Sequence, residues 1–268
     1  MADSGVQQFE TLTIDLSRPQ VAVVTLNRPE VRNALNTAMM TELRDLFQGL
    51  YVDSSGLRAI VLTGAGDKAF CAGGDLKQRN TMTDQQWQQQ HAVLEQAIEA
   101  MMACPIPVIA AVNGDCMGGG LEVALCCDFI YASDNARFAL PEGKLGIMPG
   151  GCGTQNLTRA VGERRAKELI MTGRLFNATR AQQWQLVNEV VDQSSLLEKV
   201  VAVADEIALL GPLSVQQIKK SVSVAAQTDL KTGYAFELAA YNRLIPTRDR
   251  VEGVAAFNEK RKPEFIGQ

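Results

Sequence analysis

Histidine is nearly absent from this chain of 268 residues, which contains only His91. A Ser-His-Asp triad would have to use this one residue, in the polar run 87–95, and we do not expect one. The six cysteines lack paired C-x-x-C spacing. We therefore expect no metal site and no disulfide framework, and we interpret the cysteines as reduced, mostly buried thiols.

Long apolar runs and dense blocks of positive charge are also absent. Charged residues interrupt every candidate for the roughly 18 apolar residues that a membrane span needs. The net charge is -4, and lysine and arginine are scattered, which argues against a nucleic-acid partner. Residues 1–6 have neither the layout of a secretory signal nor that of a transit peptide, so the sequence predicts a cytoplasmic protein without membrane contact.

The hydrophobic pattern predicts an α/β fold. Hydrophobic residues make up 46% of the chain and charged residues 21%, which is typical of globular proteins. Asn36 is a candidate N-cap for a helix over 37–50, and a polar stretch from 78 to 90 precedes a second helix that ends near Cys104. Alternating or apolar runs predict strands at 9–16, 21–26, 58–63, 108–112 and 129–132, connected by parallel crossovers.

The pattern becomes mainly helical after Gly162. It predicts helices at 163–172, 179–184, 195–210, 214–227, 229–243 and 251–257. No Gly/Ser linker marks a domain boundary, and the change in pattern is gradual between about 188 and 213. We divide the chain into a core, 1–195, and a C-terminal helical region, 196–268.

Glu122 is the only charged residue in the segment from Cys116 to Cys127. Three glycines precede it and an apolar helical pattern follows, which is typical of a loop that leads into a helix N-terminus. A free N–H group there can stabilise an oxyanion. The alternative is a tight turn before a core helix, with Glu122 in solvent.

Glu142 is the second carboxylate within an apolar run, which extends from Phe138 to Ile147. Burial disfavours the ionised form of a carboxylate, and two neighbouring carboxylates favour keeping one of them protonated. One can then donate a proton while the other accepts one. The alternative is a surface glutamate next to Lys144. A third segment, Phe70 to Lys77, contains Gly73-Gly74 and exposes backbone to a ligand.

The order of these motifs resembles the crotonase (enoyl-CoA hydratase/isomerase) family, from Val21 to Phe265. The matching motifs are Asn27-Arg28-Pro29, Asn33-Ala34-Leu35, Ala72-Gly73-Gly74-Asp75-Leu76-Lys77, Ala111-Val112-Asn113-Gly114, Gly118-Gly119-Gly120-Leu121-Glu122, Pro141-Glu142, Leu145-Gly146 and Pro149-Gly150. This resemblance implies a spiral of repeated ββα units. It also implies C-terminal helices that form a trimer, which often pairs into a hexamer.

The resemblance also implies site residues. The N–H groups of Gly74 and Gly119 match the family's oxyanion hole. Contacts to substrate or coenzyme A are implied for Val31, Ala72, Gly74, Asp75, Leu76, Lys77, Gly119 and Gly150. Phe257 and Lys260 match positions that reach the coenzyme A of a neighbouring subunit. Alternatively, the basic tail that begins at Lys260 is solvated surface charge without a role in binding coenzyme A.

Hydratases of this family carry both glutamates, whereas many isomerases keep only the one that matches Glu142. The resemblance thus implies an enoyl-CoA hydratase for a short or substituted 2-enoyl-CoA, such as crotonyl-, crotonobetainyl- or methylthioacryloyl-CoA. Glu142 would relay the proton at the α-carbon and Glu122 would help to activate water, with no cofactor besides the substrate's own coenzyme A. The alternatives are a Δ3,Δ2-enoyl-CoA isomerase that uses Glu142 alone and a non-catalytic, RNA-binding member of the family.

The sequence departs from the family pattern at Cys152, where many hydratases have a small residue. A side chain there either narrows the acyl pocket or fills space elsewhere. We expect the polar segment 78–90 to cover the acyl end of the substrate, because the family varies most there.

Overall fold

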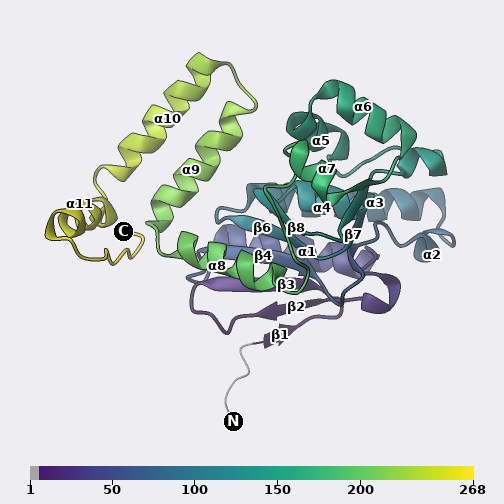
Figure 1. Ribbon diagram of the computed structural model, residues 1–268, viewed down its shortest axis with the longest axis horizontal. Coiled ribbons are helices and arrows are strands. Elements are labelled where there is room, and N and C mark those ends of the chain that lie inside the picture. Colours follow the sequence, from purple (N-terminus) through teal and green to yellow (C-terminus); the bar gives the residue numbers. More distant parts are fainter. Residues whose placement is uncertain (1–5) are drawn as a thin grey trace, which may run out of the picture.

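Two β-sheets form the centre of the molecule in the computed structural model, which describes residues 6–268 (Figure 1). The larger sheet has the order β1-β2-β3-β4-β6-β8-β11, antiparallel from β1 to β3 and parallel from β3 to β11. Its strands are β1 (Val6–Gln8), β2 (Leu12–Asp15), β3 (Val21–Leu26), β4 (Ala59–Gly64), β6 (Val108–Val112), β8 (Phe129–Ser133) and β11 (Glu189–Val191).

The smaller sheet has the order β10-β9-β7-β5, and only its β9–β10 pair is antiparallel. Its strands are β5 (Ala69–Cys71), β7 (Asp115–Met117), β9 (Arg137–Ala139) and β10 (Phe176–Asn177). The strands of the two sheets alternate along much of the chain, so that short loops such as Asn113-Gly114 carry it from one sheet to the other. The predicted α/β architecture with parallel crossovers is confirmed.

Helices connect and cover these sheets (Figure 1). They are α1 (Thr37–Val52), α2 (Leu76–Arg79), α3 (Asp84–Ala103), α4 (Gly119–Leu125), α5 (Gly153–Val161), α6 (Glu163–Thr172), α7 (Ala178–Gln183), α8 (Leu196–Ala208), α9 (Pro212–Ala225), α10 (Leu230–Leu244) and α11 (Arg248–Glu259), with short 3₁₀ helices η1 (Pro29–Val31) and η2 (Glu142–Leu145). The N-cap prediction for α1 is confirmed, because Oδ1 of Asn36 accepts a hydrogen bond of 2.9 Å from the Met39 amide.

Three α-helices differ from the prediction, and of these α2 was not expected at all. Helix α3 begins at Asp84, inside the stretch that we expected to be non-helical up to residue 90. Its start is fixed by a capping box between Thr83 and Gln86, whose side chains each accept a hydrogen bond from the other residue's amide. Helix α5 was not predicted, because the glycines around Cys152 conceal its first turn.

The larger sheet is buried on both faces, which explains why its central strands are continuously apolar. In β4, Ile60 and Leu62 belong to the main core, which they share with residues of α1 and α3. The neighbouring Val61 faces the other side and belongs to a second core with Val200 of α8. The sheet and its two helical layers thus hold the strand ends and their loops in place.

Helices α9 and α10 form a hairpin that projects away from the sheets, and α11 lies at the open end of this hairpin, near the start of α9 (Figure 1). Helix α8, by contrast, packs on the sheet through β3, β4 and β6. The division at 195/196 would group α8 with the C-terminal region and stays a prediction. Among residues 6–268, no helix combines the length and the apolar composition needed to cross a lipid bilayer.

Candidate active site

A cavity of about 580 Å³ lies where α2, α3, α4 and η2 meet. Both glutamates that the sequence singled out line it, as do five of the predicted contact residues: Ala72, Gly74, Leu76, Gly119 and Gly150. The rest of the wall consists of Leu35, Met40, Gly73, Arg79, Trp87, His91, Leu94, Gly118, Pro141, Leu145, Ile147, Met148 and Pro149. Segments far apart in the sequence therefore build one site.

Glu122 lies in the first turn of α4 and is only 3% exposed. Its Oε1 accepts hydrogen bonds from the amides of Gly151, at 2.7 Å, and Gly153, at 3.0 Å. Burial raises the pKa of Glu122, while these two amides and the nearby His91 and Arg79 oppose the increase. The two amides fix the carboxylate's orientation, and its burial rules out the alternative of a glutamate that points into solvent.

Glu142 begins η2 and is 9% exposed. Its Oε2 is buried and has no hydrogen-bond partner among residues 9–268. The pKa of Glu142 is raised to about 7: burial is the main cause and the charge of Glu122 adds to it, whereas the residue's own amide and Arg79 oppose the increase. Near neutral pH this carboxyl group can therefore gain or lose a proton easily, which a general acid or base requires.

Glycine allows two backbone segments to approach each other at this cavity. Gly73 has φ +94, and a Cβ atom on it would lie 2.9 Å from the carbonyl oxygen of Met117. The Leu35 amide donates to the Gly73 carbonyl, and the Leu35 carbonyl accepts from the Asp75 amide. The N–H of Gly74, which lies between these two residues, forms no backbone hydrogen bond among residues 6–268. Gly119 is the first residue of α4, where an N–H has no partner within its own helix.

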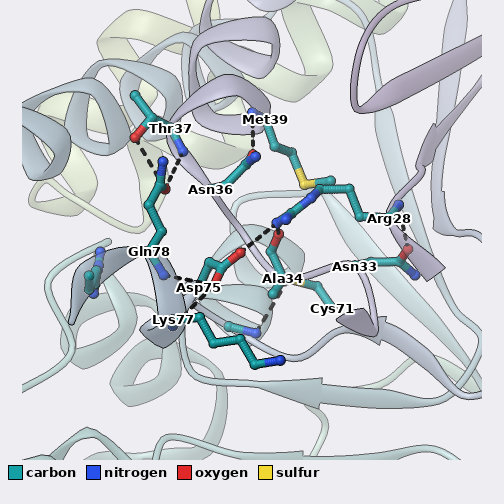
Figure 2. Close-up of polar contacts among 12 residues, drawn as sticks. Arg28, Asn33, Ala34, Asn36, Thr37, Met39, Cys71, Asp75, Lys77 and Gln78 are labelled. Carbon is teal, nitrogen blue, oxygen red and sulfur yellow. Dashed lines mark hydrogen bonds and ion pairs between the residues drawn. The ribbon is translucent and has the colours of Figure 1, made fainter. Parts of the chain in front are cut away.

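Asp75 has a structural role, and it does not line the cavity (Figure 2). Its side chain caps α2 by accepting from the amides of Lys77 and Gln78, and it forms an ion pair of 2.9 Å with Arg28. Burial alone would raise the pKa of Asp75, but the hydrogen bonds from the amides and from Arg28 keep it below its usual value. Lys77 and Val31 also lie outside the cavity wall, so their contacts with coenzyme A remain predictions.

Among the cavity-wall residues that were not predicted, three have polar or aromatic side chains: Arg79, Trp87 and His91. Arg79 ends α2, and Trp87 and His91 lie on one face of α3 together with Leu94. His91, which we considered only as a member of a triad that we do not expect, lines the cavity. A Cβ atom on Gly150 would overlap the His91 ring, lying 3.0 Å from its Cε1. The spacing of Trp87, His91 and Leu94 could have indicated this wall, because residues four and three positions apart lie on the same face of a helix.

Cys152 does not line the cavity. Its side chain is half-buried and packs against the main core, as the space-filling alternative predicted. Phe257 and Lys260 lie at the end of α11, far from the cavity of their own chain (Figure 1). Phe257 is 83% exposed, and the contact of these two residues with a neighbouring subunit's coenzyme A remains a prediction.

Comparisons with known proteins agree with this arrangement. The enoyl-CoA hydratase/isomerase family model matches residues 17–268. A crotonyl-CoA hydratase from Syntrophomonas wolfei is 39% identical over 97% of this chain and 99% of its own length. A short-chain-enoyl-CoA hydratase from Clostridium acetobutylicum is 40% identical over 91% of this chain and 94% of its own length.

The crystal structure of an enoyl-CoA hydratase from Bacillus anthracis superposes on this fold with a TM-score of 0.94. The two chains are 41% identical, and the match covers 97% of this chain and 100% of that one. The fold and the sequence thus lead to the same group of proteins. The chain belongs to the enoyl-CoA hydratase/isomerase family.

Proposed function

We propose that this protein is an enoyl-CoA hydratase that adds water reversibly, with syn stereochemistry, to a short or substituted 2-enoyl-CoA. The pair of carboxylates in one cavity carries this proposal: Glu122 is held by two amides, while Glu142 keeps a buried oxygen without a partner. The names of the two hydratase relatives support the same reaction.

In the proposed reaction a water molecule lies between the two glutamates. Its oxygen forms a bond to the β-carbon while Glu122 helps to remove its proton, and Glu142 relays a proton to the α-carbon. The double bond becomes single, and the elements of one water are added. The amides that hold Oε1 of Glu122 leave its Oε2 to contact the water, and the raised pKa of Glu142 suits a group that exchanges protons near pH 7.

Negative charge develops on the thioester oxygen during the attack. We assign its stabilisation to the N–H groups of Gly74 and Gly119, because both residues line the cavity and neither N–H forms a backbone hydrogen bond among residues 6–268. Each donor of such an oxyanion hole contributes on the order of 2.7 to 4 kcal/mol in other enzymes. This oxyanion hole and acid–base catalysis by the two glutamates together support a reaction that needs no cofactor besides the substrate's coenzyme A.

Three further parts of the proposal rest on the family resemblance. Ala72, Leu76, Lys77 and Val31 would contact coenzyme A, and Phe257 and Lys260 would contact that of a neighbouring subunit. The protein would form a trimer or a dimer of trimers. We also propose that it acts in the cytoplasm. Neither a nucleic acid nor a membrane is a proposed partner, in keeping with the net charge of -4.

Hydration of crotonyl-CoA by the wild type and by Glu122→Gln and Glu142→Gln tests the proposal. We expect each substitution to lower kcat by roughly 10²- to 10⁴-fold, because glutamine cannot exchange a proton with the substrate or water. Glu99→Gln is the matched control, since this residue is exposed on α3 outside the cavity. Equal activity in wild type and both variants would refute the paired-carboxylate assignment.

The same variants distinguish hydration from isomerisation. An isomerase that uses Glu142 alone would convert a 3-enoyl-CoA into its 2-enoyl isomer and would keep most of this activity in Glu122→Gln. The structure favours hydration, because the orientation of Glu122 is fixed by two amide donors, which a bystander residue does not need. A non-catalytic, RNA-binding protein would show salt-dependent RNA binding without turnover of any 2-enoyl-CoA.

A further inference from the structure

We propose that Arg79 selects acyl chains that end in a carboxylate, so that the preferred substrate is a 2-enoyl-CoA with a second, free carboxyl group. This inference rests on the proposed function, and it specifies the substrate class of the same cavity. Four observations support it: the placement of Arg79 by neighbouring side chains, its lack of a counterion among residues 9–268, the apolar part of the cavity wall and the closeness of Arg79 to Gly74.

Neighbouring side chains fix the position of the guanidinium. Nε of Arg79 donates a hydrogen bond of 2.8 Å to Oε1 of Gln90. The Cζ atom lies 4.8 Å from the centre of the Trp87 ring, as in a cation–π contact. Gln90 is itself held, because its amide group donates to Thr37 and to Gln78. Arg79 is thus preorganised to bind a ligand at little cost in side-chain entropy.

This guanidinium lacks an anionic partner among residues 9–268. Within that range the Arg79 side chain forms no ion pair within 4.0 Å, and the bond from Nε to Gln90 is its only hydrogen bond. The two Nη groups therefore remain available, at the wall of the cavity. Burial lowers the pKa of Arg79, and the charges of Glu122 and Glu142 oppose this shift without direct contact. Arg79 is half-buried, so its charge has lost part of its hydration without gaining a partner, and a ligand carboxylate would offset that cost.

The surrounding wall suits a short carbon stem between the thioester and this carboxylate. Five apolar side chains of the cavity are available to contact such a stem: Met40, Trp87, Leu94, Ile147 and Met148. Arg79 also lies close to the reacting end of the substrate, since its Cζ and Nη1 are 3.1 Å from where a Cβ atom of Gly74 would stand. A planar guanidinium binds a carboxylate through two parallel hydrogen bonds, which a neutral alkyl end cannot accept.

The competing interpretation is that Arg79 acts only on the two glutamates, by holding their pKa values down. It predicts that loss of the positive charge affects every substrate alike. A carboxylate-binding role predicts that only substrates with the second carboxylate are affected strongly. The ratio between two matched thioesters distinguishes these interpretations, whatever happens to the absolute rate.

Calorimetric binding of two saturated thioesters tests Arg79 without relying on turnover. The probes are glutaryl-CoA and its neutral isostere, in which an isopropyl group replaces the carboxylate. We expect the wild type to bind glutaryl-CoA roughly 10- to 100-fold more tightly, which is the range for hydrogen bonds to a charged group. Arg79→Met should abolish this preference, and Arg79→Lys should keep part of it. Arg164→Met, an exposed arginine on α6, is the matched control and should keep the full preference.

Equal affinity of the wild type for both probes would overturn the proposal, and so would a preference that survives in Arg79→Met. Hydration of crotonyl-CoA and glutaconyl-CoA is measured alongside, with kcat and KM determined separately. A wild type that binds glutaryl-CoA selectively but hydrates neither substrate would refute the proposed function and leave the role of Arg79 supported. An equal loss of kcat/KM for both substrates in Arg79→Met would favour the competing interpretation and refute ours.

Discussion

Glu142 is the residue whose charge state the fold controls most directly. Its Oε2 is buried without a partner among residues 9–268, and burial raises its pKa from 4.5 to about 7. Between these two values the folded protein binds more protons than the unfolded chain. Stability from this group is therefore fully present below pH 4.5 and is lost as the pH rises through about 7.

Glu142→Gln should remove this pH dependence, because glutamine resembles the protonated form. We expect wild type and variant to unfold at similar temperatures near pH 5. At pH 8 the variant should be more stable by about 1 to 2 kcal/mol, less than the full pKa shift implies because solvent screens part of the interaction. Thermal unfolding at a series of pH values measures the difference. A constant difference between the two proteins over this range would contradict the expectation.

Helix α4 can approach the smaller sheet closely because of Gly120. A Cβ atom on Gly120 would lie 2.7 Å from Cβ of Cys71 in β5 and would overlap the Cys71 carbonyl. We expect Gly120→Ala to destabilise the fold by roughly 1 to 3 kcal/mol, the usual range for overpacking. It should also lower the activity, since α4 carries Glu122 and begins at Gly119.

Gly49→Ala provides the matched control for this substitution. Gly49 lies inside α1, and a Cβ atom on it would have no neighbour within 4 Å. The same added methyl group should here stabilise the protein by roughly 0.5 to 1 kcal/mol, because alanine favours the helix more than glycine does. Chemical unfolding of the two variants should give shifts of opposite sign; shifts of the same sign would contradict the packing argument.

The sequence was sufficient for the elements with strong periodicity and for the residues with a family motif. Strand β4 and helix α1 could be predicted from their apolar spacing, and Glu122 and Glu142 from their position in apolar runs. The start of α3 was missed although Thr83 and Gln86 carry a capping-box signal, because polar composition was given more weight than this motif.

Other features depend on tertiary structure and could not be predicted from local sequence. The amides of Gly151 and Gly153 reach Glu122 only because α5 packs beside α4. Arg79 enters the cavity wall because α2 ends there, and a single arginine after a Gly-Gly loop has no pattern that indicates burial. Groups whose positions depend on the packing of helices and strands against one another therefore cannot be predicted from the local sequence.

At the scale of the whole molecule, α10 presents an apolar stripe to its surroundings. Its members follow helical spacing, and all are exposed: Leu230, Tyr234, Leu238 and Tyr241 on the helix and Ile245 at its C-cap. A stripe of this kind on a helix that projects from the core is typical of a subunit interface. It supports the proposed trimer.

Charge placed in this stripe tests that interface. We expect Tyr234→Asp combined with Leu238→Asp to convert the oligomer into a monomer, because an aspartate buried between subunits would lose its hydration without a partner. Light scattering after size-exclusion chromatography measures the mass. The exposed pair Lys220→Asp and Lys231→Asp on the same hairpin controls for added negative charge. An unchanged mass for the stripe variant would place the interface elsewhere.

The single histidine of the chain has a practical consequence, because it lies in the cavity wall with its Nδ1 atom 2.9 Å from Oε1 of Glu95. In a proton NMR spectrum its imidazole signals can be assigned without labelling or mutagenesis, since no second histidine competes. Trp87, one of only two tryptophans, lies in the same wall and adds a fluorescence signal. The wild-type protein thus carries two built-in reporters of what enters its cavity.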